Sequence, residues 1–153
     1  MPIQNNMLRE EEISLKLFIV LTRALASVRS RVEENIKSFG LNPTEFAVLE
    51  LIYHKGDQPI QKIGEKVLIA SSSITYVVDK LETKNLLKRK PCPKDRRITY
   101  ATVTEKGVNV MDDIFPKHTA AIHEILGGLN DSEKEMMIEQ LKKLGYFAQS
   151  LND

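Results

Sequence analysis

The sequence has a single cysteine among its 153 residues, which excludes an internal disulfide bond. A reducing cytoplasm is the simplest setting for such a chain. No apolar run approaches the roughly 20 residues needed to span a bilayer, and no signal-peptide pattern opens the sequence, so we expect a cytoplasmic protein without a membrane partner. No Ser/His/Asp constellation, glycine-rich phosphate loop or metal-ligand cluster is visible. We therefore expect neither an enzyme nor a bound metal or cofactor.

Strong overall charge is also lacking, since the formal net charge is +1. The charges are nevertheless segregated. The fourteen residues from Lys84 to Arg97 hold seven cations and one anion, a net charge of +6, so the rest of the chain has a net charge of −5. This distribution is expected of a DNA-binding face on a mildly acidic body. A chain of this length forms one compact unit, or one small domain with helical extensions.

Two short segments between Ile60 and Thr83 have helical spacing and predict a pair of helices that cross at a sharp angle. Gly64 lets the two backbones approach closely, and Leu68 ends the first helix. The outer face of the second helix is short, rich in hydroxyls and basic towards its end, which suits the major groove of DNA. The residues expected to be buried are Ile74, Val77, Val78 and Leu81, and those expected outside are Ser72, Ser73, Thr75, Tyr76, Asp79, Lys80 and Thr83.

The residues after this helix pair predict a two-stranded wing. Ile98–Val103 alternates and is rich in β-branched residues, which is typical of a strand. The basic stretch before it supplies the other strand and a tip that bears proline, lysine and arginine. Together these elements predict a winged helix-turn-helix over residues 41–104. Most charge runs are only solvated surface, so this conclusion depends on the combination and not on the cations alone.

Long amphipathic helices flank the winged unit. From about Glu10 to Phe39 apolar residues recur at three- and four-residue steps, and Gly40 is expected to end this helix in a left-handed conformation. Asn42 and Glu45 then form a capping box around Pro43 at the start of the next helix. These signals place the beginning of the winged unit at residue 41.

Two more helices are predicted after the wing. Thr104 caps the first, whose apolar positions form a narrow coiled-coil-like seam; Pro116 lies inside it and should bend it. Asn130 and Glu133 form another capping box at the start of the last helix. His118 lies on the seam and is interpreted as a packed or interface histidine. It points roughly 140° away from the other histidine of this helix, which makes a poor pair for chelating a metal.

The apolar stripes of the first and last helices exceed what so small a domain covers, so we expect a second copy of the chain to pack against them about a two-fold axis. The predicted fold is mainly α with a small β-wing (α+β). Residues 1–40 form an N-terminal dimerisation helix, 41–104 the winged unit and 105–153 the C-terminal dimerisation helices. Such a homodimer is expected to bind a palindromic operator in double-stranded DNA, with half-sites about 10 bp apart.

Several motifs resemble the MarR family of bacterial transcription regulators. They are Leu41–Phe46, the helix pair through Ser71–Thr75, and Asp95–Arg97 followed by Val103–Gly107. The resemblance covers nearly the whole chain and implies a triangular homodimer that represses a promoter and releases it when a small molecule binds or a cysteine is modified. Residues 38–43 and 57–61 resemble the MhqR-type branch, whose members respond to quinones and related phenolics. The peroxide-sensing branch uses a cysteine in the first helix, which this chain lacks, so peroxide sensing is not expected.

By this resemblance, Arg97 matches a wing-tip arginine that enters the minor groove, and Asp95 matches the acid that orients it. A narrow A·T minor groove concentrates negative potential, and an acid two residues away can hold the guanidinium in place. Ser71, Ser73, Thr75 and Lys80 match recognition-helix contacts, and helical facing adds two more residues. The full set of expected DNA contacts is Ser71, Ser72, Ser73, Thr75, Tyr76, Lys80, Lys84, Lys94, Arg96 and Arg97.

A small aromatic effector is the expected ligand, and the sequence leaves its site open. Cys92 lies among cations, which favour the reactive thiolate and would make it a target for electrophiles such as quinones. The alternative is a small residue at the base of the wing with no sensing role. The other candidates are equally compatible with the core or, for the histidine, with a helix cap. They are Phe18, Phe39, Phe46, His54 and Met111.

A second function class stays open from the sequence alone. It is a winged-helix module that binds protein without sequence-specific DNA recognition and uses its basic wing for solubility. For Lys88, Arg89 and Lys90, phosphate contact and plain solvation are equally compatible with the pattern. DNA binding is favoured because seven cations crowd fourteen residues beside a hydroxyl-rich helix face.

Overall fold

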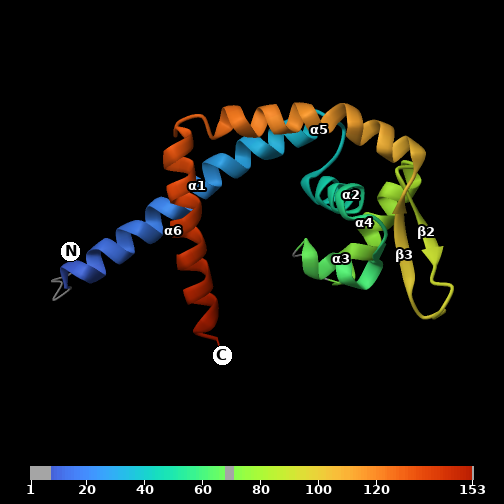
Figure 1. The fold of residues 1–153 in the computed structure, drawn as a ribbon, viewed down its shortest axis with the longest axis horizontal. Coiled ribbons are helices and arrows are strands. Elements are labelled where there is room, and N and C mark those ends of the chain that lie inside the picture. Colours follow the sequence, from blue (N-terminus) through green and yellow to red (C-terminus); the bar gives the residue numbers. More distant parts are fainter. Residues whose placement is uncertain (1–7, 68–70, 153) are drawn as a thin grey trace, which may run out of the picture.

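Six helices and a three-stranded antiparallel sheet make up the part of the chain that the computed structural model describes, residues 8–67 and 71–152. Figure 1 shows α5 running over the winged unit, while the amino-terminal half of α1 and all of α6 project away from it. Among the described residues, no helix is both long and apolar enough to cross a membrane. In chain order the elements are α1 (Arg9–Lys37), α2 (Pro43–Lys55), β1 (Gln58–Pro59), α3 (Ile60–Lys66), α4 (Ser71–Thr83), β2 (Leu87–Pro91), β3 (Thr99–Val103), α5 (Glu105–Ile125) and α6 (Asp131–Ser150).

The corner between α1 and α2 forms as its sequence predicts. Gly40 has φ +81°, a left-handed conformation that a β-carbon would disfavour. The side chain of Asn42 accepts a hydrogen bond from the Glu45 amide at 2.7 Å, and the Glu45 carboxylate accepts one from the Asn42 amide at 3.1 Å. Pro43 occupies the first helical position. Helix α1 ends two residues before its predicted end, because residues 38–40 form hydrogen-bonded turns that lead to the left-handed glycine.

The core of the winged unit lies where α2, α3 and α4 meet the sheet. The predicted buried face of α4 is confirmed, since Ile74, Val77, Val78 and Leu81 are each at most 5% exposed. Helix α3 ends at Lys66, and the predicted stop at Leu68 lies outside the described residues. The sheet has the order β1-β3-β2, and its first strand, β1, was not predicted. Strands β2 and β3 form the antiparallel wing that the alternation of Ile98–Val103 predicts.

Helix α5 begins against the turn that precedes the wing. The Thr104 side chain accepts a hydrogen bond from the Gly107 amide at 2.9 Å, which is the predicted cap. A β-carbon added at Gly107 would lie 2.1 Å from the carbonyl oxygen of Leu86, so only glycine fits this approach. Pro116 lies inside the helix, and Figure 1 shows α5 as a curved helix.

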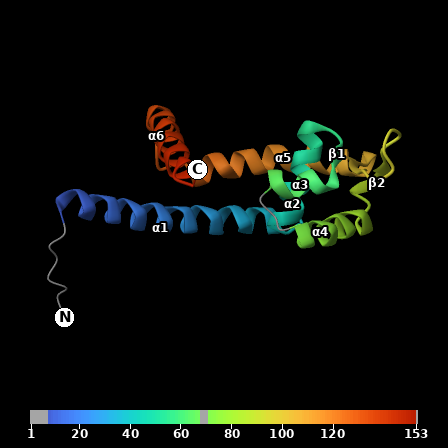
Figure 2. The same ribbon diagram turned by 90° about the horizontal axis from the view of Figure 1, so that it is seen from below.

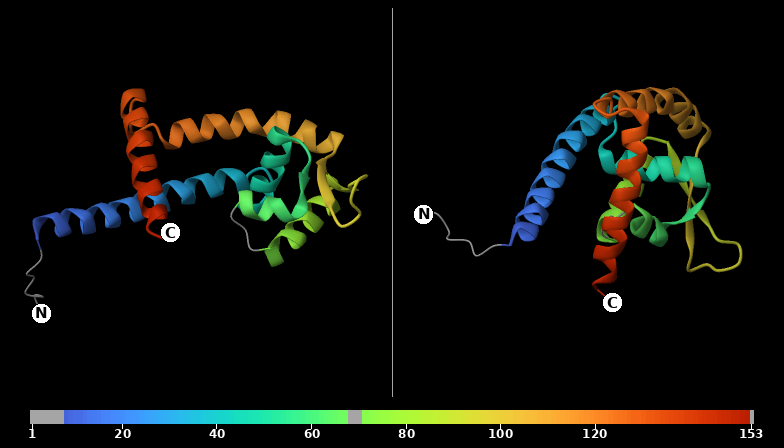
Figure 3. Two further views of the ribbon diagram at one scale, coloured as in Figure 1. Left: turned by 60° about the horizontal axis from the view of Figure 1, so that its bottom comes forward. Right: turned by 60° about the vertical axis from the view of Figure 1, so that its left-hand side comes forward.

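The helical arms are covered only in part by the chain itself. Helices α1 and α5 contact each other and run towards the winged unit (Figure 2). All residues of α6 are exposed apart from the half-buried Lys134, and the left-hand view of Figure 3 shows α6 crossing α1 away from the winged unit. Large apolar side chains therefore face outward on both arms. Those that are more than half exposed include Ile13, Leu17, Phe18, Met136 and Phe147.

Candidate nucleic-acid interface

The outer face of α4 is exposed and polar along its described length. Ser73, Thr75, Asp79 and Lys80 are all exposed, and Tyr76 is 62% exposed. The Lys80 ammonium lies 5.4 Å from the centre of the Tyr76 ring, a cation–π distance that holds both side chains on the same surface. The face predicted for major-groove contact is therefore open to a ligand. The side chains of Ser71 and Ser72, at the start of α4, lie outside the described residues.

The wing ends in an arginine that an acid holds in a fixed geometry. The Nε of Arg97 donates to Oδ1 of Asp95, and an Nη donates to Oδ2, both at 3.1 Å. The backbone amide of Arg97 also donates to Oδ1 at 3.0 Å. These hydrogen bonds from Arg97 lower the pKa of Asp95, so the carboxylate stays ionised at neutral pH. The pairing expected from the sequence is present, and it leaves the Arg97 side chain 90% exposed.

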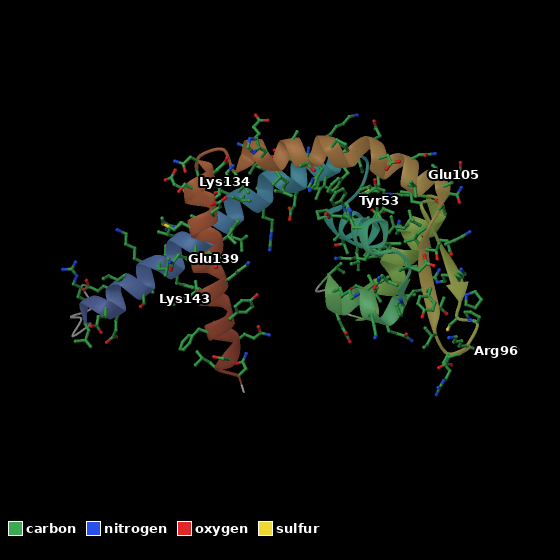
Figure 4. The ribbon with its side chains drawn as sticks, in the orientation of Figure 1. Tyr53, Arg96, Glu105, Lys134, Glu139 and Lys143 are labelled. Carbon is green, nitrogen blue, oxygen red and sulfur yellow. The ribbon has the colours of Figure 1, made fainter. Side chains whose placement is uncertain are left out.

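The turn at the tip of the wing is closed by backbone hydrogen bonds. The amide of Ile98 donates to the carbonyl of Asp95 at 3.1 Å, and the amide of Cys92 donates to the carbonyl of Ile98 at 3.0 Å. The exposed side chains of Lys94 and Arg96 project from this turn, and Figure 4 shows Arg96 pointing away from the tip. The tip therefore presents three cations on a short loop of defined shape.

Lys84, one of the expected DNA contacts, is paired within the protein. Its ammonium donates to Oε2 of Glu45 at 2.7 Å and to the carbonyl of Gly40 at 3.2 Å. The Glu45 side chain is only 6% exposed and that of Lys84 is 38% exposed, so a half-exposed lysine neutralises a buried carboxylate. Helical facing failed here because the residue follows the last residue of α4 and turns back towards the corner between α1 and α2. We assign Lys84 to holding the winged unit together.

Arg89 fits neither of its two sequence interpretations, because it is paired within the protein. Its guanidinium donates to Glu82 at 2.8 Å and to Asp79 at 2.6 Å, and the hydrogen bond that Asp79 accepts is the main reason why the pKa of Arg89 is raised. Its neighbours Lys88 and Lys90 are exposed. The basic run thus divides into paired cations that stabilise the domain and exposed cations on the surface of the wing.

The structure does not bring the candidate effector residues together. Phe46 and Met111 are 2% and 0% exposed and belong to the core, so for them the structural interpretation holds. Phe18 is 65% exposed and lies 18 residues before the buried Ile36 on the same helix, a separation of about 27 Å. His54 is exposed at the end of α2. These residues therefore do not line one common pocket within the described part of a single chain, and their role in effector binding stays a prediction.

The remaining two effector candidates also lie apart. Phe39 is half-buried and packs against the core beside the corner between α1 and α2. Cys92 is half-buried where β2 passes into the tip of the wing, among the exposed cations. The hypothesis that Cys92 reacts with electrophiles thus stays a prediction about the wing and does not involve the core residues.

An aromatic and histidine cluster joins α1, α2 and α5, and the sequence identified only part of it. The ring centre of His118 lies 4.5 Å from that of Phe46, and its Nδ1 is 3.1 Å from Oδ1 of Asn35. The prediction of a packed histidine is confirmed. Burial lowers the pKa of His118, while the charge of Glu50 acts in the opposite direction. The hydroxyl of Tyr53, labelled in Figure 4, hydrogen-bonds to Asp112.

An apolar groove of about 760 Å³ lies between α1 and α6. The seams that predicted dimerisation line it from both sides, including Leu17, Leu21, Met137, Leu141 and Leu144. Within the described part of the chain, no group of three His, Cys, Asp or Glu side chains is arranged to hold a metal ion.

Comparison with known sequences agrees with the geometry. The profile of the MarR family matches residues 41–99. The chain is 57% identical over 142 residues to the HTH-type transcriptional regulator MhqR of Bacillus subtilis (strain 168), covering 93% of this chain and 98% of MhqR. It is 27% identical over 132 residues to the transcriptional repressor MprA of Escherichia coli (strain K12), covering 82% of this chain and 75% of MprA.

Solved structures share the fold. AbsC, a MarR family transcriptional regulator from Streptomyces coelicolor, superposes with a TM-score of 0.78 at 18% identity, covering 96% of this chain and 99% of AbsC. Sco3205 from the same organism, solved in complex with DNA, gives a TM-score of 0.77 at 17% identity and covers 91% of each chain.

The fold and the exposed face of α4 and the wing are those of a winged-helix transcription regulator that binds DNA. Its relatives are regulators and not enzymes. The chain belongs to the MarR family, and the similarity to MhqR supports the MhqR-type branch of that family.

Proposed function

We propose that the chain acts as a homodimeric repressor of a palindromic operator and that a small phenolic or quinone-like effector releases it from DNA. The observation that carries the proposal is the pairing of an open polar face on α4 with an exposed Arg97 whose orientation Asp95 fixes. A helix of this kind enters the major groove, and an arginine held at a wing tip enters the narrow minor groove beside it.

Exposed polar and charged side chains on α4 and the wing determine how the protein would dock on DNA. Ser73, Thr75 and Tyr76 contact base edges or backbone from α4, while Lys80, Lys94 and Arg96 lie where they can contact phosphates. Ser71 and Ser72 stay in the proposed set because α4 begins at Ser71 and a helix start suits a phosphate. Lys84 is left out for the reason given above.

The dimer is supported by the amount of apolar surface that one chain leaves uncovered. Side chains such as Phe18, Met136 and Phe147 are each 65% exposed, and a stable monomer rarely leaves so many large apolar groups in water. A second copy related by a two-fold axis would cover the groove between α1 and α6 with the same residues from the partner. Two recognition helices would then face one side of the duplex, which requires a palindrome.

The effector is proposed from the branch and from chemistry near the wing. Residues 38–43 and 57–61 resemble the MhqR-type branch, whose members respond to quinones and related phenolics, and the whole chain is 57% identical to MhqR. Cys92 lies among cations and half-exposed, which suits attack on an electrophilic quinone. A non-covalent phenol would instead bind beside the ring cluster of α2 and α5, where the ring centres of His54 and Phe115 are 4.6 Å apart.

The first experiment is selection of DNA from a random pool by the purified protein, followed by binding of variants to the selected duplex. Arg97→Ala should lower the affinity by about 1–3 kcal/mol and relax specificity at the edges of each half-site. Arg31→Ala is the matched control, because Arg31 is an exposed arginine paired with Glu34 on α1, away from the wing. Equal affinity of the Arg97→Ala variant and the parent would show that the docking is wrong.

The dimer and the effector need separate measurements. Sedimentation at micromolar concentration should give a dimer, and Leu141→Glu in the apolar groove should give a folded monomer with weaker operator binding. A monomeric parent protein would contradict the proposal. Release of the operator by quinones, phenols and aromatic acids tests the effector class. If Cys92→Ser responds to quinones as the parent does, the thiol is not the sensor.

A further inference from the structure

Arg89, on the outer strand of the wing, is bound by two acids of α4. Its Nη1 donates to Oε1 of Glu82 at 2.8 Å, and its Nη2 donates to Oδ1 of Asp79 at 2.6 Å. The guanidinium therefore joins two carboxylates that lie about one helical turn apart. Its planar fork of donors suits two acceptors at once, which a lysine ammonium does not.

Glu82 also binds the backbone of the same strand. In the order β1-β3-β2, strand β2 is an edge strand, and its outward amides have no partner within the sheet. The amide of Arg89 is one of these, and it donates to Oε2 of Glu82 at 3.2 Å. Each oxygen of one carboxylate thus accepts a hydrogen bond from Arg89, one from the side chain and one from the main chain. Three hydrogen bonds join α4 to the wing at a single residue of β2.

We propose that Arg89 is a positioning residue that sets the distance and angle between α4 and the wing, so that both reach the same duplex. It is not a phosphate contact, since a phosphate would have to displace two carboxylates from its guanidinium. The proposal rests on the docking proposed above, in which α4 lies in the major groove and the wing in the minor groove.

Whether Arg89 positions the wing or contacts phosphate can be decided from the direction in which DNA affinity changes when an acid of α4 is neutralised. Asp79 and Glu82 are acids on the helix that faces DNA, and an acid near phosphates lowers affinity. If they did nothing else, neutralising Glu82 would strengthen binding and free Arg89 for a phosphate. If they hold the wing, neutralising Glu82 weakens binding to a specific duplex although it removes a repulsive charge.

The first test measures affinity for a duplex selected by the parent protein and for a shuffled duplex, over a range of salt concentrations. Arg89→Met and Glu82→Gln should each lower specific affinity on the order of tenfold, and the double variant should lose no more than either single variant. Lys117→Met is the matched control, since it removes a cation paired with Asp113 on α5, and it should bind as the parent does.

Two results would overturn the role of Arg89. One is stronger binding by the Glu82→Gln variant. The other is an equal loss on both duplexes by Arg89→Met, with the slope of log K against log salt reduced by about 0.9, as expected when one phosphate contact is removed. Arg89→Lys should recover only part of the affinity, because an ammonium cannot reproduce the planar fork that engages both carboxylates.

A second test needs no DNA and so separates this proposal from the docking. Nitroxide labels at Lys80→Cys and Lys94→Cys, in a Cys92→Ser background, report the short distance between α4 and the wing within one subunit. Arg89→Met should broaden that distance distribution while the far-ultraviolet circular dichroism stays that of a folded protein. An unchanged distribution would overturn the proposal. A broadened distribution with unchanged affinity for the selected duplex would instead contradict the docking.

Discussion

Gly107, at the start of α5, should not accept a larger residue unless the surrounding chain moves. An alanine β-carbon at this position would lie 2.1 Å from the Leu86 carbonyl oxygen and 2.7 Å from Cγ2 of Val103. Ordinary contact begins near 3.4 Å, so the start of α5 would have to move by about 1.3 Å. The Leu86 carbonyl also accepts a hydrogen bond from the Thr104 amide at 3.1 Å, so this movement disturbs the cap of α5 as well.

The free energy of unfolding should fall by about 1–3 kcal/mol in Gly107→Ala. Overpacking of this kind costs about 1–3 kcal/mol, and a weakened cap costs about 1 kcal/mol. Alanine offsets this by roughly 1 kcal/mol, because it favours a helix more than glycine does. For a chain of this length the melting temperature would drop by roughly 2–12 °C.

The assay is urea denaturation followed by circular dichroism at one protein concentration, since association affects the apparent stability. Gly145→Ala is the matched control in α6, where an added β-carbon meets nothing within 4 Å among the described atoms. It should be neutral or more stable by up to about 1 kcal/mol. A Gly107→Ala variant within about 0.5 kcal/mol of the parent would refute the close approach at Leu86.

Three further predictions follow from single contacts. Lys84→Met should destabilise the protein by about 1–2 kcal/mol in urea denaturation, because it leaves the Glu45 carboxylate buried without its partner. The salt dependence of DNA binding should stay unchanged in this variant. Asp95→Ala should weaken operator binding in a gel-shift titration although it removes a negative charge, because Arg97 loses its orientation; stronger binding would contradict this role. Burial lowers the pKa of His118, so the unfolded state binds the proton more tightly than the folded state does. The urea midpoint should therefore fall as pH drops below about 6.5, and it should level off below the pKa of the folded state. The variant His118→Phe should reduce that fall.

Local patterns predicted much of the fold because their causes are local. The capping boxes at Asn42 and Asn130, the buried face of α4 and the pair Asp95–Arg97 all depend on residues within a few positions of one another. Helical and strand periodicity then fixes which side chains face inward. The same reasoning gave the wing, but it did not predict β1, since two residues that include a proline carry almost no strand pattern.

The candidate sites were predicted less well wherever a partner comes from a distant part of the chain. Lys84 pairs with a residue 39 positions away, and the pairing of Arg89 depends on how β2 packs beside α4. A cationic run shows how many charges are present but not which of them are neutralised inside the domain. The effector candidates stay predictions for a related reason, since the residues of a core and of a ligand pocket have the same composition.

Polar contacts and one close approach join the elements of the winged unit to one another and to α5. Arg89 joins the wing to α4, and Lys84 joins the end of α4 to the corner at Gly40. Gly107, which has no side chain, lets the start of α5 lie close to the backbone of Leu86. Relative movement of α4 and the wing would break buried or paired polar contacts, whereas α6 and the outer half of α1 have no comparable ties within the described chain. We therefore expect the proposed effector to act on the proposed homodimer by changing the distance at which the helical arms hold the two winged units. The shape of each DNA-contacting surface would stay the same. Chemical modification of Cys92 is the exception, because it would act on the wing itself.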